Sequence, residues 1–245
     1  MTALADVIAG LPPVSLDELN GRAELLTRVD RKYFVPRVAL AAILALAGGL
    51  QALQIDGRRS FRYLTVYFDS DDFVHYREHL QGRRHRFKVR TRTYCESGQS
   101  LLEVKSKGYR GQTVKQRRPR RAQHPARLDA DERAFVSAIT GRDAASLRPM
   151  LETDYHRTTL CVGDQRVTLD TDLSCRAGAR RAHGPDDVLV ETKSPDGRSD
   201  IDGALVHGGF RPHSVSKYCI GAALLYPQLP HNPWHRTLRR SFAAA

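Results

Sequence analysis

The chain has 245 residues, 41% of them hydrophobic, which is enough for a buried core in one large or two small domains and argues against disorder. Its net charge of +12 is concentrated, because residues 83–121 hold 14 Lys or Arg and only 2 Asp or Glu. Such a surplus indicates a polyanionic partner, namely nucleic acid, a nucleotide, polyphosphate or an acidic membrane, unless the stretch is only a solvated basic face.

Other classes of protein are excluded by what the sequence lacks. The four cysteines show neither CxxC pairing nor ligand-like spacing with histidine, so we expect reduced thiols rather than a zinc site or disulfide framework. The longest apolar run, 38–50, has 13 residues and is too short to cross a bilayer core of about 30 Å. The first ten residues lack the basic region of a secretory signal. We therefore expect a cytoplasmic protein without a transmembrane segment.

Helices and strands alternate in the first third of the chain. Ser15 and Glu18 have the spacing of a capping box, and Asp56-Gly57 is a typical hairpin turn. The expected elements are a helix over 16–26, a strand over 28–35, a helix over 37–47, a hairpin of strands over 51–56 and 60–69, and a helix over 71–80.

Three strands carry the basic stretch, over 87–94, 101–107 and 113–117, with a turn at 108–111. Charged residues recur at every second position in them, and such positions lie on one side of a strand. The resulting charged face holds Lys88, Arg90, Arg92, Glu103, Lys105, Lys107, Lys115 and Arg117. Outside this pattern, Arg118, Arg120 and Arg121 are expected to be solvated.

The second half of the chain also contains strands in which charged residues alternate. Its expected elements are a helix over 131–140, strands over 150–162, 166–173 and 188–193, a helix over 201–206, an apolar helix that opens near 213–218 and runs to 225, and a mobile tail from 227. We expect Asp170 and Asp172 on one strand face, and Glu191 and Lys193 together on another.

These elements predict an α+β fold, an eight-stranded and mostly antiparallel β-barrel with helices packed outside. In a sandwich, charged strand faces would meet water. Here nearly every polar stripe carries Arg, Lys, Glu or Asp, which favours a closed barrel with a charged, wet lumen that holds anions.

Nine short motifs then point to a family. They are Arg28-x-Asp30-x-Lys32-Tyr33, Tyr63-Leu64-Thr65-Val66-Tyr67-Phe68-Asp69, Lys88-x-Arg90-x-Arg92, Leu102-Glu103-Val104-Lys105, Val114-Lys115-x-Arg117, Tyr155-x-Arg157-Thr158, Arg166-Val167-Thr168-Leu169-Asp170, Val190-Glu191-Thr192-Lys193 and Ser216-Lys217-Tyr218. Their order is that of the VTC (vacuolar transporter chaperone) domain, which resembles the triphosphate tunnel metalloenzymes and the wider CYTH group. The resemblance implies a tunnel domain over 28–226, a helical lead-in over 1–27 and a tail over 227–245.

The resemblance also implies roles for individual residues. The cations expected to contact phosphate and form the catalytic set are Lys32, Arg90, Arg92, Lys105, Lys115, Arg157, Lys193 and Lys217. Within that set Arg90, Arg92, Lys105 and Lys217 are expected to bind the nucleotide. Glu191 matches a carboxylate that binds Mn²⁺ or Mg²⁺, and Glu103 and Asp170 are further candidate metal ligands. Arg28 and Asp30 replace two glutamates of the tunnel hydrolases, which favours the VTC branch.

The activity implied is that of a polyphosphate polymerase, which transfers the γ-phosphate of ATP to phosphate, pyrophosphate or polyphosphate. An inorganic triphosphatase and a non-catalytic polyphosphate-binding module remain open. A P-loop NTPase is not expected, because no GxxxxGK[ST] element occurs. Nucleic acid is disfavoured, since Glu103, Asp170 and Glu191 inside the charged stripes would repel its backbone. The sequence makes no prediction of oligomeric state.

Overall fold

The computed structural model describes residues 3–22, 29–107, 113–120, 124–195 and 199–242. The chain divides into two compact units, each built from separate segments. Unit 1 comprises Met1–Phe61, Tyr155–Leu173 and Gly184–Val215, and unit 2 comprises Arg62–Asp154, Ser174–His183 and Ser216–Ala245. Among the described residues, no helix is long and apolar enough to span a bilayer. The cytoplasmic location and the domain boundaries stay predictions.

Eight strands follow one another in the order β2-β11-β9-β8-β4-β5-β6-β7. In that order they are Val29–Val35, Val188–Ser194, Gln165–Ala177, Arg148–Val162, Ser60–Asp69, Phe87–Tyr94, Ser100–Lys107 and Thr113–Arg120. The pairs β2–β11, β11–β9, β4–β5, β5–β6 and β6–β7 are antiparallel. The predicted α+β class and eight-stranded antiparallel order are therefore confirmed. Within the described strands β2 pairs only with β11 and β7 only with β6, so hydrogen bonds closing a barrel are not observed.

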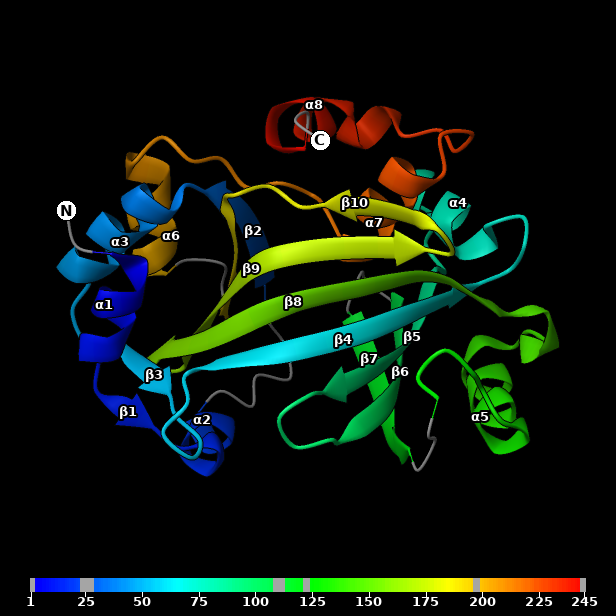
Figure 1. Cartoon of the computed structure of the whole chain (residues 1–245), viewed down its shortest axis with the longest axis horizontal. Helices are drawn as coiled ribbons and strands as arrows, with labels where there is room; N and C mark the ends of the chain where they lie inside the picture. Colours follow the sequence, from blue (N-terminus) through cyan, green and yellow to red (C-terminus); the bar gives the residue numbers. More distant parts are fainter. Residues whose placement is uncertain (1–2, 23–28, 108–112, 121–123, 196–198, 243–245) are drawn as a thin grey trace. The chain divides into compact units, whose positions relative to one another are not determined.

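The core of unit 1 lies between its strands and its helices. The helices are α1 (Leu4–Gly10), α2 (Leu16–Arg22), α3 (Arg37–Leu46) and α6 (Asp200–His207), and α1, α3 and α6 lie together at one side of β2 in Figure 1. Alternate strand residues form an apolar face that packs against Leu40 and Leu44 of α3 and Ile201 and Leu205 of α6. The strand residues of this face are Tyr33, Val35, Val167, Leu169, Val188 and Val190. The intervening positions consequently form an opposite, charged face.

Unit 2 is built in the same way. Its helices and 3₁₀ turns are α4 (Val74–Leu80), α5 (Ala130–Thr140), η2 (Ala144–Ser146), α7 (Lys217–Leu225), η3 (Asn232–Trp234) and α8 (His235–Ser241). Helix α5 begins with a capping box in which Asp129 and Glu132 exchange hydrogen bonds, and ends at left-handed Gly141. Its Val136 packs on strand residues Val66, Phe68, Val89, Leu102 and Val104.

The predicted hairpin of strands 51–56 and 60–69 differs from the structure. Asp56 and Gly57 do form a tight turn with positive φ values of 48° and 75°, and a single bridge joins Ile55 to Arg58. However, β3 (Gln51–Leu53) pairs with β1 (Pro13–Val14) and β8 instead of β4. The turn was correctly predicted, but the strands on either side of it pair with other strands and not with each other.

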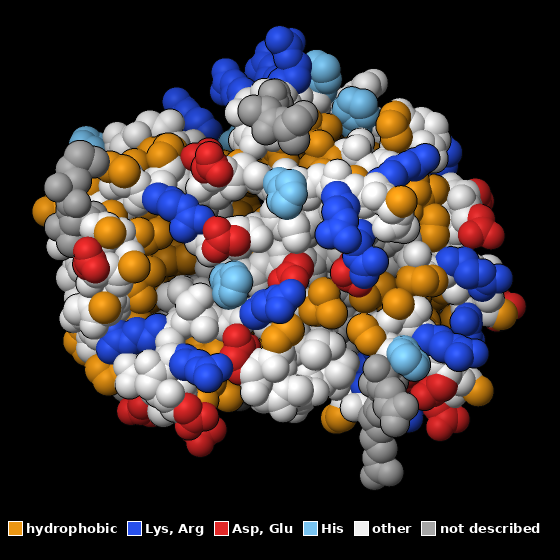
Figure 2. Space-filling model, viewed as in Figure 1, with side chains coloured by type: hydrophobic (Ala, Val, Ile, Leu, Met, Phe, Trp, Pro, Cys, Tyr) orange, Lys and Arg blue, Asp and Glu red, His pale blue; other side chains and the backbone are white. Residues whose placement is uncertain are grey.

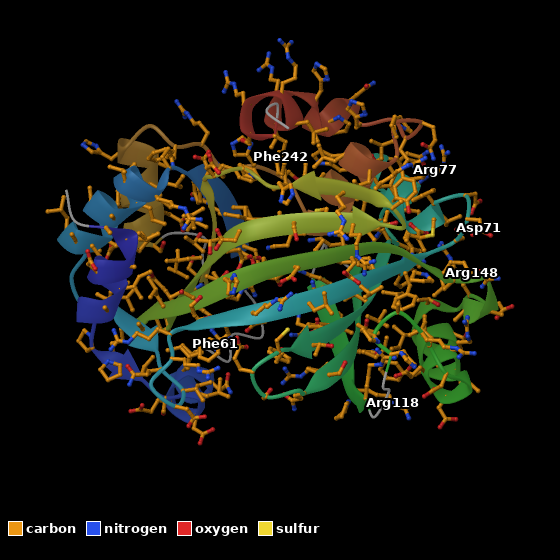
Figure 3. All side chains as sticks on the ribbon, viewed as in Figure 1. Phe61, Asp71, Arg77, Arg118, Arg148 and Phe242 are labelled. Atoms are coloured by element: carbon orange, nitrogen blue, oxygen red, sulfur yellow. The ribbon has the colours of Figure 1, made fainter. Side chains whose placement is uncertain are left out.

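Further differences concern the C-terminal tail and one additional strand. The tail predicted to be mobile contains η3 and α8, because Leu229 and Trp234 are 2% and 6% exposed and Trp234 packs edge-on against Tyr76. Figure 3 marks Phe242 just beyond α8. Strand β10 (Arg180–His183), which pairs with β9, was not predicted. The predicted turn at 108–111, Arg28 and Arg121 lie outside the described residues.

Arg118 and Arg120, both predicted to be solvated, lie on the face of β7 opposite Lys115 and Arg117. Arg118 is 41% exposed and its Nη2 lies 3.9 Å from Asp131 Oδ2. Arg120 is buried, with its Nε donating to Glu132 Oε1 at 2.5 Å, so its solvation was wrongly predicted. A buried guanidinium needs such a partner, and no local sequence signal connected these two residues.

Candidate functional site

The charged face of unit 1 centres on Glu191 of β11. Strand register places Glu191 opposite Lys32 of β2, and Lys193 opposite Asp30. The Nζ atoms of Lys32 and Lys193 lie 3.6 Å and 2.9 Å from the two Glu191 carboxylate oxygens. The carboxylate therefore lies between two ammonium groups, and the predicted pairing of Glu191 and Lys193 on one strand face is confirmed.

Lys193 has a proton affinity unlike that of a surface lysine. Its side chain is 12% exposed. Burial lowers the pKa of Lys193 from 10.5 to about 8, while Glu191 acts in the opposite direction and Arg157 adds to the lowering. An anion that binds beside Lys193 would raise this pKa and favour proton uptake by the amine.

Arg157 and Asp170 form a second, tighter pair in unit 1. Arg157 donates from Nε and Nη2 to the two Asp170 oxygens at 2.6 Å and 2.7 Å, and the Asp170 side chain is 1% exposed. The Arg157 guanidinium also lies 5.4 Å from the centroid of the Tyr155 ring. This bidentate geometry occupies both oxygens of Asp170.

Asp172 does not share a face with Asp170, contrary to the prediction. Its φ of 55° interrupts the alternation of β9. Its carboxylate consequently accepts from Arg37 at 2.8 Å and lies 3.8 Å from His156, whereas Asp170 binds the neighbouring Arg157. A backbone irregularity of this kind has no signature in the alternating pattern.

The charged face of unit 2 contains one buried carboxylate among three cations. Glu103 of β6 is 1% exposed; its Oε2 lies 2.7 Å from Arg90 Nη2 and 3.8 Å from Arg92 Nε, and its Oε1 lies 3.4 Å from Lys115 Nζ. Burial by itself would raise the pKa of Glu103, but Arg90, Arg92 and Lys115 outweigh it and hold the pKa well below its usual range. The acid is a permanent internal counter-ion, and the cluster keeps an excess of positive charge.

Beside this cluster three lysines lie in a row. Lys105 of β6 is directly opposite both Lys88 of β5 and Lys115 of β7. Like charges directly opposite one another destabilise a sheet. Burial, opposed by Glu103 and reinforced by Arg90, lowers the pKa of Lys115. An anion in front of the row would relieve this repulsion.

Aromatic side chains of β4 support the arginines of the cluster. The guanidinium of Arg90 lies 5.9 Å from the Tyr67 ring centroid, and that of Arg92 lies 5.4 Å from the Tyr63 ring centroid. Tyr67 is directly opposite Arg90 on the neighbouring strand. These contacts hold planar guanidinium groups in place, a role of the tyrosines that the strand pattern does not predict.

The structure therefore separates the predicted site residues into two sets. Unit 1 brings together Lys32, Arg157, Asp170, Glu191 and Lys193, and unit 2 brings together Arg90, Arg92, Glu103, Lys105 and Lys115. Lys217, the first residue of α7, belongs to unit 2. Burial raises the pKa of the Cys175 thiol to about 12, and the charge of Lys217 opposes that shift. Figure 2 shows one face of the molecule, on which basic and acidic side chains are interspersed.

The three candidate metal ligands differ in how well they fit a divalent ion. Both oxygens of Asp170 accept from Arg157, and Glu103 is enclosed by three cations. Glu191 is 15% exposed and its partners are lysines. The described residues contain no cluster of three or more His, Cys, Asp or Glu that could hold a metal. Mg²⁺ is commonly held by one or two carboxylates together with substrate phosphates, and Glu191 fits that kind of site.

A family model, the VTC domain, matches residues 27–226. The chain belongs to the VTC domain family. No curated protein matches it.

Solved structures that are similar to the VTC chain share little sequence with it. A putative adenylyl cyclase from Hippeastrum, described as having a dominant triphosphatase activity, is 13% identical with a TM-score of 0.48, over 84% of this chain and 100% of that one. A putative adenylate cyclase from Bacillus halodurans is 13% identical with a TM-score of 0.45, over 75% and 86%. A Pyrococcus horikoshii protein is 11% identical with a TM-score of 0.45, over 76% and 92%. At these values the similarities say nothing about activity.

Proposed function

We propose that this VTC chain is a polyphosphate polymerase, which transfers the γ-phosphate of ATP to phosphate, pyrophosphate or the end of a polyphosphate chain. The observation that carries the proposal is the row of Lys88, Lys105 and Lys115 beside the cluster of Arg90, Arg92 and Glu103. Like charges directly opposite one another repel, and several linked phosphates in front of the row would offset that repulsion.

The reaction needs charge stabilisation more than it needs covalent chemistry. An oxygen of the acceptor phosphate forms a bond to the γ-phosphorus, the bond from that phosphorus to the β-bridging oxygen breaks, and ADP leaves with the electron pair. Arg90 and Arg92 supply planar groups that bind two phosphate oxygens each, and Lys105, Lys115 and Lys217 supply point charges. A bound Mn²⁺ or Mg²⁺ would neutralise charge on the phosphate oxygens.

Unit 1 supplies groups suited to the same task. Glu191 would hold the divalent ion, and Lys32 and Lys193 would exchange part of their contact with Glu191 for contact with phosphate. Arg157 is kept oriented by Asp170 and the Tyr155 ring.

The test is an assay of chain growth. Purified protein is incubated with ATP, Mn²⁺ and a pyrophosphate primer, and we expect ADP together with a product that exopolyphosphatase removes. The variant Lys115→Met should lose most of this activity. Arg118→Met is the matched control, because it removes a cation from the opposite face of the same strand and should remain active.

Two other results would replace the proposal with one of the alternatives. Phosphate release from tripolyphosphate without chain growth would identify a triphosphatase. Tight tripolyphosphate binding with no ADP formed under any metal would identify a non-catalytic binding module.

A further inference from the structure

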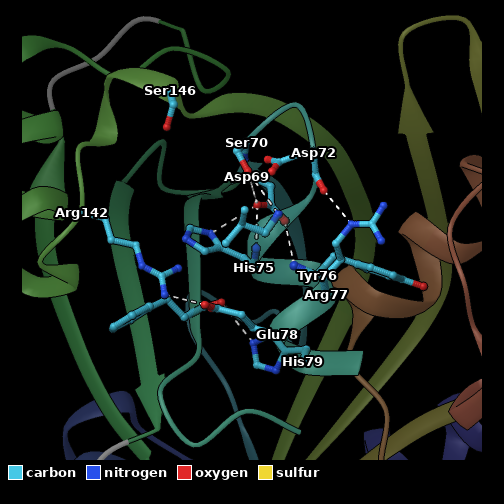
Figure 4. A network of polar contacts seen from close by, with 12 residues as sticks. Asp69, Ser70, Asp72, His75, Tyr76, Arg77, Glu78, His79, Arg142 and Ser146 are labelled. Atoms are coloured by element: carbon cyan, nitrogen blue, oxygen red, sulfur yellow. Dashed lines mark hydrogen bonds and ion pairs between the residues drawn. The ribbon is translucent and has the colours of Figure 1, made fainter. Parts of the chain in front are cut away.

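A buried carboxylate, Asp69, lies at the end of β4 in unit 2 and is 0% exposed. It accepts hydrogen bonds from the backbone N–H groups of Ser70 at 2.8 Å, His75 at 2.9 Å and Tyr76 at 2.9 Å (Figure 4). A fourth donor is the hydroxyl of Tyr218, from helix α7. These bonds, together with a longer one from the Ser70 hydroxyl at 3.5 Å, compensate for burying the charge and fix the carboxylate firmly in place.

Tyr218 reaches Asp69 across the charged face of the unit 2 sheet. Asp69 and Tyr67 are two residues apart on β4, and Tyr67 is directly opposite Arg90. The Tyr218 ring stacks on the Tyr67 ring with centroids 5.2 Å apart and an interplanar angle of 27°. The Tyr67 hydroxyl in turn lies 3.4 Å from Arg90 Nη1. The beginning of α7 therefore lies on the same face as the arginine cluster.

Helix α7 makes further close contacts within unit 2. Ser216 caps its first turn by accepting from the Cys219 N–H at 3.2 Å. A Cβ atom at Gly221 would come within 2.8 Å of Leu151 Cδ2 and 2.9 Å of Cys175 Sγ, so a larger residue would force these side chains to shift. The Tyr218 hydroxyl provides the polar anchor of the helix, one residue after Lys217.

We propose that Asp69 and Tyr218 are positioning residues, which hold the first turn of α7, and with it Lys217, on the sheet face that carries Arg90, so that the lysine ammonium group meets phosphate. This inference rests on the proposed function. A lysine side chain is long and flexible, so its contribution to binding depends on how well its backbone is fixed. Burial and then the charge of Asp69 raise the pKa of Tyr218 well above its ordinary value, so the hydroxyl keeps its proton and remains a donor.

The test is a double-mutant cycle on the affinity for tripolyphosphate, measured by calorimetry in metal-free buffer. Tyr218→Phe keeps the ring stack and removes only the hydroxyl, and we expect it to weaken binding about tenfold. In the Lys217→Met background the same change should weaken binding by less than about twofold, because the residue through which it acts is gone. Asp69→Asn should behave as Tyr218→Phe does.

Tyr33→Phe is the matched control for a loss of stability. The Tyr33 hydroxyl donates to the buried Asp202 at 2.7 Å, so this variant also removes a buried tyrosine–carboxylate bond, but on the apolar face of unit 1. It should lower the melting temperature as Tyr218→Phe does and leave tripolyphosphate affinity within about twofold of the wild type.

The outcomes separate the inference from the proposed function. The positioning role would be overturned if Tyr218→Phe weakened tripolyphosphate binding by the same factor with and without Lys217. It would also be overturned if Tyr33→Phe lost as much affinity as Tyr218→Phe. Either result would leave phosphate binding in place. A wild-type chain that does not bind tripolyphosphate would overturn both proposals. A loss of tripolyphosphate affinity that is non-additive with Lys217→Met, and that occurs only on changing Tyr218 or Asp69, would establish the role whether or not the chain polymerises phosphate.

Discussion

Replacing Glu103 by Gln should have opposite effects on stability and on anion binding. The wild-type carboxylate is 1% exposed and contacts Arg90, Arg92 and Lys115. The amide keeps the shape but leaves the three cations without their counter-ion. Loss of one partner from a buried ion pair costs roughly 3–5 kcal/mol, and because the glutamine oxygen still accepts a hydrogen bond we expect about 3 kcal/mol.

The same change should strengthen the binding of tripolyphosphate in metal-free buffer. The cluster would present three positive charges to the ligand with no carboxylate competing for them. We expect affinity to rise about tenfold at low salt, or about 1.4 kcal/mol, with a smaller gain at high salt. Chemical denaturation with and without ligand measures both effects, since ligand at 100 times its Kd stabilises a protein by about 2.7 kcal/mol.

Glu152→Gln provides the matched control for this prediction. Glu152 pairs with Arg176 at 2.7 Å in unit 2, but its side chain is 23% exposed and that of Arg176 is 47% exposed. Loss of this surface pair should cost less than about 1 kcal/mol and leave affinity unchanged. If Glu103→Gln is as stable as wild type, or binds tripolyphosphate no better, Glu103 is not the internal counter-ion of this cluster.

Acid stability provides an independent check on Glu103. Its folded pKa lies below the ordinary value of 4.5, so its contribution is complete above that pH and is lost as the pH falls towards the folded value. The stability advantage of wild type over Glu103→Gln should therefore shrink below about pH 4. A difference that stays constant down to pH 2 would contradict the assignment.

Three further predictions concern other parts of the chain. Because the pKa of Lys193 is about 8 in the folded state, tripolyphosphate affinity should fall as the pH rises through 8, and calorimetry in buffers of different ionisation enthalpy should show proton uptake that Lys193→Met lacks. Glu191→Gln should fold normally yet lose Mn²⁺-dependent turnover, and full activity in that variant would remove the metal assignment. Trp234→Ala should lower the free energy of unfolding by about 3 kcal/mol, whereas a freely mobile tail would leave it unchanged.

The strand faces of this protein were predictable because alternation is a local property. Lys32, Glu191 and Lys193 lie on one face and Val188 and Val190 on the other, as period two requires. The helix expected over 131–140 was likewise located from its local sequence, and the structure has it at Ala130–Thr140.

Other features of the fold depend on pairing between distant residues, which alternation does not specify. The Asp56-Gly57 turn predicts a hairpin, yet β3 pairs with β1 and β8. The local sequence predicts Arg120 as a surface charge, because it does not reveal the partner Glu132 on α5. Positive φ at Asp172 reverses the side of the strand on which its carboxylate lies.

The site itself shows the same division between residue type and partner. The resemblance implied Glu191 as the metal-binding carboxylate and Glu103 and Asp170 as further candidates, and the neighbours of each acid show how they differ. Asp170 is bound through both oxygens by one arginine, and Glu103 is surrounded by two arginines and a lysine, so each is a fixed counter-ion. Glu191 is more exposed and paired with lysines, whose ammonium groups are point charges that can turn to a phosphate without breaking a bidentate contact. The acid best placed to meet a metal is therefore the one held least rigidly by its cations.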